Sequence, residues 1–253
     1  MSLENKLLSG KRVMVLGASR GIGRGIVERA SAEGGQVLAV ARGKDDLARL
    51  AGRGINTLAL DATSESAPSM VFGNTPPDVL VICGGALPQP ALVSELNWDQ
   101  FSVNWEVDTK MAFLFCREAL RVPLVPRSVV VIISSGAGFC GGTANSGGYA
   151  GAKRMQMILA KYCQAESDRR GLGICFVALV PTNIMPETEL GQAAVNCHAR
   201  DLGVPPEKFL ESMDRRRLSP VDVVEAVIKT AVRPPTEAGS IFKIYADKLV
   251  AAN

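Results

Sequence analysis

A serine, a tyrosine and a lysine occur at spacings that suit proton transfer to or from a substrate oxygen. Ser135 ends an apolar run, Tyr149 comes fourteen residues later, and Lys153 lies four residues after Tyr149. If Tyr149 opens a helix, this spacing places Lys153 on the same face. A tyrosine has a reference pKa of ~10, which a neighbouring ammonium lowers by favouring the phenolate. Such a pair can protonate a carbonyl oxygen or deprotonate an alcohol, while Ser135 hydrogen-bonds the same oxygen.

A glycine-rich turn near the start of the chain is typical of a dinucleotide-binding site. The sequence from Gly17 to Gly23, GASRGIG, joins an expected strand at Lys11–Leu16 to an expected helix that begins at Gly21. Glycine lets the backbone turn tightly and lets a pyrophosphate approach main-chain N–H groups, while the helix N-terminus adds its positive dipole end. The residues of this turn that we expect to contact the dinucleotide are Gly17, Ser19, Arg20, Gly21, Ile22 and Gly23.

The end of the second expected strand, Gln36–Ala41, discriminates between the two nicotinamide dinucleotides. In NAD-binding units an acid near this point binds the ribose 2′-hydroxyl. Here Arg42 follows the strand, and no acid occurs before Asp45. Arg42 and Arg20 are placed to meet a 2′-phosphate, whose geometry suits the planar guanidinium. The sequence therefore predicts NADP (NADPH) as the cofactor, with NAD less likely.

The third expected strand, Asn56–Leu60, ends at Asp61 and Ala62. The Asp61 carboxylate could accept a hydrogen bond from the adenine amine. It could equally cap the turn at Thr63–Ser64, since aspartate favours that position.

Short apolar runs alternate with helical patterns along the chain. Four further strands are expected, at Asp78–Ile82, Arg127–Ile133, Gly173–Val180 and Ser240–Tyr245. Helices are expected from Gly21 to about Glu33 and at Lys44–Ala51, Trp98–Val122, Tyr149–Arg169 and Pro220–Arg233. Buried strands without alternation, separated by helices, indicate parallel pairing with helices on both faces. We predict an α/β Rossmann fold over residues 1–253, a single domain with a doubly wound sheet of about seven strands. The glycine pattern argues against a TIM barrel, the competing architecture.

One region, Pro186–Leu218, interrupts the alternation of strands and helices. It is polar and contains Arg215-Arg216-Arg217. A long insertion after a strand is a candidate substrate lid, and a surface helical hairpin is compatible with that interpretation.

The composition excludes several chemistries. A zinc site with two or three histidines is impossible, because His198 is the only histidine. A Ser-His-Asp triad would need this same residue, which lies far from any nucleophile elbow. We expect no metal, and the net charge of +3 is too small to indicate nucleic-acid binding. The N-terminus lacks the apolar region of a signal peptide, and no apolar run reaches ~18 residues. Together with six cysteines that form no CxxC motif, this favours a cytoplasmic protein away from membranes.

Taken together, these motifs resemble the classical short-chain dehydrogenase/reductase family over nearly the whole chain. The resemblance is carried by Gly17, Gly21, Gly23, Asp61, Ser135, Tyr149 and Lys153 in this order and spacing. It implies a Rossmann fold that transfers hydride between NAD(P) and a carbonyl or alcohol. It also implies Tyr149 as general acid/base, Lys153 as ribose ligand and phenol tuner, and Ser135 as ligand of the substrate oxygen. A homodimer or homotetramer would pair the helices at Trp98–Val122 and Tyr149–Arg169.

Several positions depart from the family pattern. Ile82-Cys83-Gly84-Gly85 stands where the family has Asn-Asn-Ala-Gly, and Asp108 stands where a helix asparagine supports a proton relay. Asp108 could still organise water through its backbone carbonyl, although its side chain adds charge. The distance in sequence from Ser135 to Tyr149 is one residue longer than usual, which keeps Ser134 as an alternative. The family's Pro-Gly reads Pro181-Thr182 here, and threonine turns less freely than glycine.

The leading hypothesis is an NADP(H)-dependent oxidoreductase of a small or medium carbonyl or secondary alcohol. The expected catalytic residues are Ser135, Tyr149, Lys153 and Asp108. Beyond the glycine turn, the expected dinucleotide contacts are Arg42, Asp61, Ala62, Cys83, Gly84, Gly85, Tyr149, Lys153, Pro181, Thr182 and Ile184. Two alternatives are a non-catalytic dinucleotide sensor, suggested by the altered asparagine positions, and a reductase of carrier-bound 3-ketoacyl groups, suggested by Arg215–Arg217.

Overall fold

The central element is a sheet of parallel strands. The computed structural model describes residues 6–73, 75–213, 218–235 and 240–252. The strands are β1 (Arg12–Leu16), β2 (Gln36–Ala41), β3 (Asn56–Ala59), β4 (Val79–Ile82), β5 (Val129–Ile133), β6 (Cys175–Pro181), β7 (Ile241–Ile244) and β8 (Leu249–Ala251). Their order is β3-β2-β1-β4-β5-β6-β7-β8, and every pair except β7–β8 is parallel. This order confirms the predicted doubly wound α/β fold.

The strand β8 was not predicted. It has three exposed residues and pairs antiparallel with the edge strand β7. Its three residues, LVA, are apolar, but so short a run cannot be told from a loop by its pattern.

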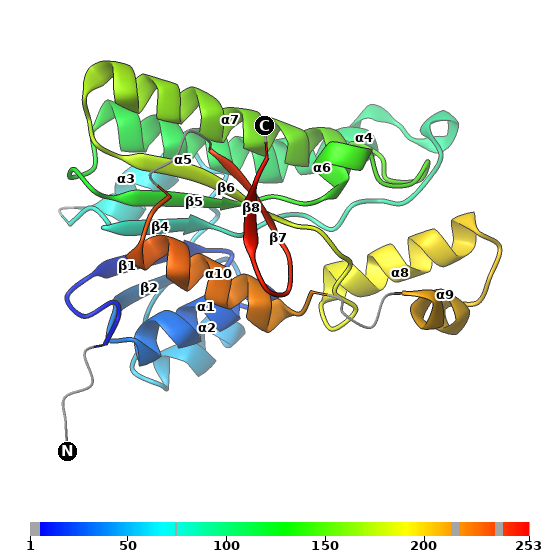
Figure 1. Cartoon of the computed structure of the whole chain (residues 1–253), viewed down its shortest axis with the longest axis horizontal. Coiled ribbons are helices and arrows are strands. Elements are labelled where there is room, and N and C mark those ends of the chain that lie inside the picture. The colour runs from blue at the N-terminus through cyan, green and yellow to red at the C-terminus, as the bar shows by residue number, and fades with distance from the viewer. Residues whose placement is uncertain (1–5, 74, 214–217, 236–239, 253) are drawn as a thin grey trace.

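Helices cover both faces of the sheet (Figure 1). On one face lie α1 (Gly21–Ala32), α2 (Lys44–Ala51) and α10 (Pro220–Val232). On the other lie α3 (Ala67–Phe72), α5 (Lys110–Arg121) and α7 (Tyr149–Arg170). Strands β1, β4 and β5 are almost wholly buried, as their unbroken apolar runs require.

The long helix expected at Trp98–Val122 is interrupted. Helix α4 (Trp98–Asn104) passes into a π-helical turn at Trp105–Thr109, and α5 follows at Lys110. Such π-turns occur mostly inside α-helices and often at functional sites. The predicted helical stretch is therefore confirmed from Trp98 to Arg121, and the π-helical turn within it was not predicted.

The insertion after β6 forms two helices, α8 (Glu189–Asp201) and α9 (Pro206–Ser212). The Thr188 hydroxyl caps α8 by accepting a hydrogen bond from Gly191 N at 2.9 Å. Both helices lie at the end of the sheet where the parallel strands finish, at the right of Figure 1. The Arg215–Arg217 run lies outside the described residues. Within the described part of the chain, no helix combines the length and apolarity needed to cross a bilayer.

Candidate active site

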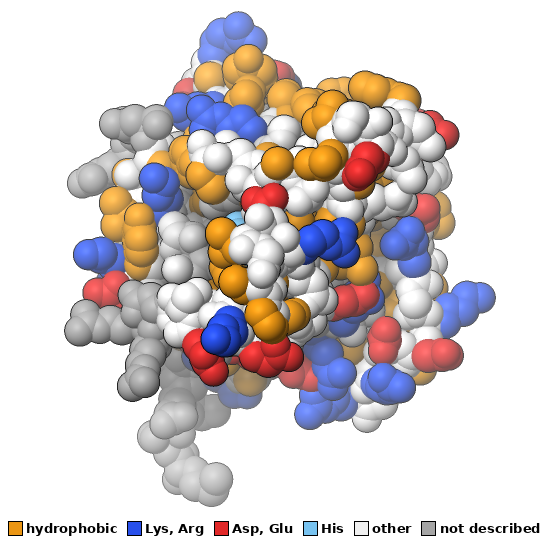
Figure 2. Space-filling model, turned by 90° about the vertical axis from the view of Figure 1, so that its right-hand side faces the viewer, with side chains coloured by type: hydrophobic (Ala, Val, Ile, Leu, Met, Phe, Trp, Pro, Cys, Tyr) orange, Lys and Arg blue, Asp and Glu red, His pale blue; other side chains and the backbone are white. Residues whose placement is uncertain are grey.

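The carboxyl ends of the parallel strands surround a cavity of about 1050 Å³. The sheet order changes direction between β1 and β4, and open α/β sheets bind ligands at such a switch point. Helix α8 forms a further wall of the cavity. Figure 2 looks onto the right-hand end of the molecule in Figure 1, where positive and negative side chains are interspersed.

Two glycines of the turn after β1, Gly17 and Gly23, leave no room for a side chain. Gly17 has a φ of +78°, and a Cβ added there would lie 2.4 Å from Gly84 Cα. A Cβ at Gly23 would lie 2.1 Å from Gly17 O. Gly21 has a φ of +53°, and nothing lies within 4 Å of its added Cβ. Helix α1 has no side-chain cap, so its first amides can bind an anion. This turn has the shape and the donors that a pyrophosphate needs.

All the residues that the sequence predicted to contact a dinucleotide line this one cavity. They are Gly17, Ser19, Arg20, Gly21, Ile22, Gly23, Arg42, Asp61, Ala62, Cys83, Gly84, Gly85, Tyr149, Lys153, Pro181, Thr182 and Ile184. The structure thus brings them together from the ends of five strands and from the start of α7. Their individual roles stay predictions.

The two arginines differ in their surroundings. Arg42 is exposed at the end of β2, whereas Arg20 forms an ion pair with Glu189 at the start of α8. The Asp61 carboxylate accepts hydrogen bonds from Thr63 N at 2.9 Å and Thr63 Oγ1 at 2.8 Å. These two hydrogen bonds hold the pKa of Asp61 below its usual value, and the bond from the Thr63 backbone has the larger effect. Asp61 therefore makes the capping contact that the sequence offered as an alternative to adenine binding.

The altered glycine segment after β4 packs closely against the π-helical turn and α5. A Cβ at Gly84 would lie 2.9 Å from Met111 Cε, and one at Gly85 would lie 2.8 Å from Asp108 Oδ2. Burial raises the pKa of the Cys83 thiol to about 11, so this side chain is neutral near pH 7. The Met111 side chain occupies the space beside Gly84, and the Asp108 side chain occupies the space beside Gly85.

The backbone at Thr182 has an ordinary conformation. Its φ is outside the left-handed region, where Arg127 is the only non-glycine residue in the described part of the chain. Instead the Thr182 hydroxyl donates a hydrogen bond to Ile244 O at 2.7 Å. The side chain thus ties the segment after β6 to the end of β7.

The proposed proton donor and its neighbours converge at one end of the cavity. Tyr149 is the first residue of α7, half-buried, and the Lys153 ammonium lies 5.6 Å from its ring centroid. Ser135 is half-buried, and its oxygen accepts a hydrogen bond from Ala137 N at 3.3 Å. The neighbouring Ser134 is buried, and its hydroxyl donates to Lys153 O at 2.7 Å. Of the two serines, Ser135 therefore has the hydroxyl hydrogen available for a ligand.

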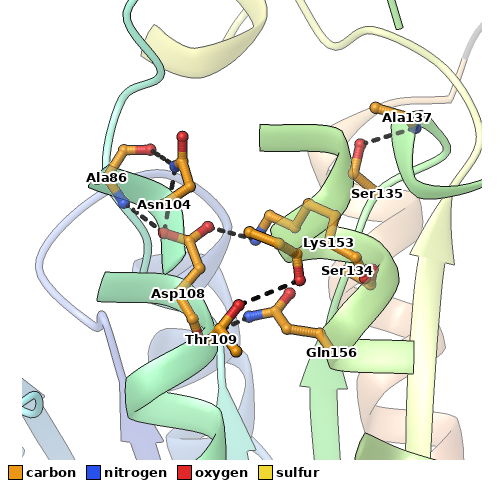
Figure 3. A network of polar contacts seen from close by, with 10 residues as sticks. Ala86, Asn104, Asp108, Thr109, Ser134, Ser135, Ala137, Lys153 and Gln156 are labelled. Carbon is orange, nitrogen blue, oxygen red and sulfur yellow. Dashed lines mark hydrogen bonds and ion pairs between the residues drawn. The ribbon is translucent and has the colours of Figure 1, made fainter. Parts of the chain in front are cut away.

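Lys153 is buried against a carboxylate (Figure 3). Its Nζ lies 2.9 Å from Asp108 Oδ2, and both side chains are less than a tenth exposed. Burial by itself lowers the pKa of Lys153, but the charges of Asp108 and Tyr149 outweigh it, so the pKa lies above the usual value. The Asp108 carbonyl, expected to organise water, accepts a hydrogen bond from Gln156 Nε2 at 3.1 Å. That carbonyl therefore has a protein partner at one of its acceptor positions.

The sequence analysis missed the wall that faces these residues. Asn145 is buried and donates from Nδ2 to Asp201 Oδ1 at 3.1 Å, which joins the loop before α7 to α8. Thr143 and Cys197 form a second contact between the same elements at 3.3 Å. His198 also lines the cavity and stacks on Phe209 of α9, with ring centroids 5.3 Å apart. No spacing in the sequence relates a loop to a helix some fifty residues away, as the separation of Asn145 and Asp201 requires.

Comparisons with known proteins agree with this geometry. A family model described as short chain dehydrogenase matches residues 11–196. The chain is 31% identical over 230 residues to L-xylulose reductase from Bos taurus, covering 88% of each chain. It is 24% identical over 249 residues to 3beta-hydroxysteroid dehydrogenase from Mediterraneibacter gnavus, covering 94% of this chain and 89% of the other. A crystal structure of 3-ketoacyl-(acyl-carrier-protein) reductase from Brucella melitensis complexed with NADH shares the fold. It superposes with a TM-score of 0.75 and 21% identity, covering 93% of this chain and 96% of that one.

Proposed function

This chain belongs to the short-chain dehydrogenase family of oxidoreductases, which act on CH–OH groups, and we propose that it is an NADP(H)-dependent reductase of small or medium carbonyl compounds. The observation that carries this proposal is the convergence of Ser135, Tyr149 and Lys153 with the glycine turn on one cavity. A chain that only bound a dinucleotide would have no need of the three polar side chains at that place.

The residues of the cavity divide the chemistry between them. When bound, NADPH supplies the hydride that adds to the carbonyl carbon. Tyr149 gives its phenolic proton to the carbonyl oxygen, and the Ser135 hydroxyl hydrogen-bonds the same oxygen. The Lys153 ammonium, 5.6 Å from the Tyr149 ring, stabilises the phenolate that remains. In the reverse direction the phenolate accepts the proton of an alcohol.

Arg42 is expected to select NADPH over NADH. Replacing it (Arg42→Ala) removes a charge-assisted contact to the 2′-phosphate, which is typically worth ~1.5–3 kcal/mol. NADPH binding should weaken about tenfold to a hundredfold, while NADH binding stays unchanged. Fluorescence titration of both cofactors measures this.

The matched control is Arg53→Ala, which removes an exposed arginine that pairs with Glu28 and does not line the cavity. It should leave both affinities unchanged. Equal weakening of the two cofactors by Arg42→Ala, or tighter binding of NADH by the unaltered chain, would refute the assigned preference.

The substrate is best sought among hydroxylated ketones. One relative, 31% identical, is named L-xylulose reductase, and polar side chains line the same cavity as Tyr149, among them Asn145, Ser146 and His198. The test follows NADPH absorbance with L-xylulose, simple aldehydes and ketones, a 3-ketosteroid and a 3-ketoacyl thioester. Turnover of L-xylulose or of the simple aldehydes and ketones supports the proposal. Preference for the thioester would favour a reductase of carrier-bound 3-ketoacyl groups. NADPH binding without turnover of any carbonyl compound would favour a sensor.

The same proposal includes a cytoplasmic homodimer or homotetramer built through α4, α5 and α7. Trp98, Phe113 and Tyr162 on these helices are between 45% and 71% exposed. Large apolar side chains grouped on neighbouring helices are typical of a surface that a second subunit covers.

A further inference from the structure

A buried carboxylate stands directly beside the lysine of the proposed catalytic set. Asp108 is 0% exposed and Lys153 is 5% exposed. Asp108 Oδ1 accepts from Ala86 N at 2.8 Å and from Asn104 Nδ2 at 3.3 Å. Asp108 Oδ2 pairs with the Lys153 ammonium, whose Nζ lies 2.9 Å away. One oxygen is thus held by the scaffold, and the other is committed to the ammonium (Figure 3).

The surrounding segments are shaped to keep this carboxylate in place. The π-helical turn carries Asp108 at its fourth residue, and the Gln156 amide of α7 holds its carbonyl at 3.1 Å. Gly85 leaves the room that the carboxylate occupies, since a Cβ there would lie 2.8 Å from Oδ2. Contacts from three separate segments therefore fix one charge at one position.

The groups whose charges reach Lys153 are few. Asp108 on the π-helical turn, Tyr149 on α7 and Cys83 after β4 are the titratable groups that influence it. The Cys83 thiol is uncharged near pH 7 because burial raises its pKa to about 11. The charge of the lysine is therefore opposed mainly by Asp108. A compensated ammonium stabilises a phenolate less than a free one does.

We propose that Asp108 is a positioning residue that holds the Lys153 ammonium toward Tyr149, neutralises part of its charge, and so raises the pH at which Tyr149 changes between proton donor and acceptor. This inference rests on the proposed function of Tyr149. With a neutral residue at position 108, the same site would work at lower pH.

The test is Asp108→Asn, which keeps an oxygen for Ala86 N and Asn104 Nδ2 but removes the charge. We expect the acidic limb of alcohol oxidation and the basic limb of carbonyl reduction to move to lower pH by about one unit. The plateau rates should stay within about tenfold of the original. Because loss of one partner of a buried ion pair often destabilises a fold, Asp108→Ser serves as the second variant, since it leaves room for water beside the ammonium. The same shift is expected.

Two controls separate charge from structure. Asn104→Ala removes the amide that contacts both Ala86 O, at 2.9 Å, and Asp108, without changing any charge. It should lower rates equally at all pH values. Glu118→Gln removes a carboxylate that pairs with Arg121 on α5, and should leave the profile unchanged. An unshifted profile in both Asp108 variants, or a shift to higher pH, would overturn the inference while the activity of the unaltered chain still supports the proposed function.

Discussion

Replacing Tyr149 by phenylalanine is expected to lower the rate of carbonyl reduction by a factor of about 10² to 10⁴, the usual contribution of a positioned general acid. The change removes one hydroxyl from the first residue of α7 and leaves the ring that lies beside Lys153. NADPH binding should stay close to that of the unaltered chain. Steady-state rates and a fluorescence titration of NADPH measure the two effects separately.

The matched control lies on the same helix. Tyr162 is 65% exposed and does not line the cavity, so Tyr162→Phe removes a hydroxyl of the same kind from a place without a substrate. Its rate should equal that of the unaltered chain. A Tyr149→Phe variant with an undiminished rate would remove Tyr149 from the mechanism.

Gly17→Ala is expected to damage both the fold and the dinucleotide site. The added Cβ would lie 2.4 Å from Gly84 Cα and Gly84 N, and the φ of +78° is strained for any L-residue with a side chain. Both neighbours are backbone, so one of the two turns has to move. We expect a loss of about 3 kcal/mol in the free energy of unfolding and a melting temperature lower by roughly 10 °C. NADPH affinity should fall at least about tenfold. Thermal unfolding and cofactor titration provide the measurements.

Gly10→Ala isolates the effect of the backbone angle. Gly10 has a φ of +76°, but nothing lies within 4 Å of an added Cβ, and it does not line the cavity. This variant should lose only about 1 kcal/mol and bind NADPH normally. If Gly17→Ala and Gly10→Ala had equal effects, the close approach of Gly84 would not be the reason that position 17 requires glycine.

Much of the fold could be predicted because its signals are local. The runs that form β2 and α2 were predicted with their observed bounds, since one is apolar after its first residue and the other is a short amphipathic helix between glycines. The doubly wound parallel sheet was predicted from the alternation of buried strands and helices. The eighth strand was missed because three residues are too few to show a pattern, and the π-helical turn has no sequence signal that distinguishes it from the helices on either side.

The candidate site was likewise predicted only in part from the sequence. Spacing alone placed Tyr149 and Lys153 on one helix and Gly17 in a turn between strand and helix. It could not distinguish Ser134 from Ser135, because the choice depends on the Lys153 carbonyl that takes the Ser134 hydroxyl. Nor could it identify the wall that Asn145 and Asp201 form with α8, which joins residues 56 apart in the sequence.

By itself, therefore, the sequence determined the type of fold, the glycine turn and the residues able to move a proton. These depend on periodicity and on the conformational freedom of single residues, which are local properties of the chain. Only the tertiary structure decided what surrounds the Lys153 ammonium. The sequence placed Asp108 at the position of the family's relay asparagine, but it did not predict that the carboxylate is buried 2.9 Å from that ammonium. The energy of a charge depends on burial and on the nearest opposite charge, and both are set by segments far apart in the chain.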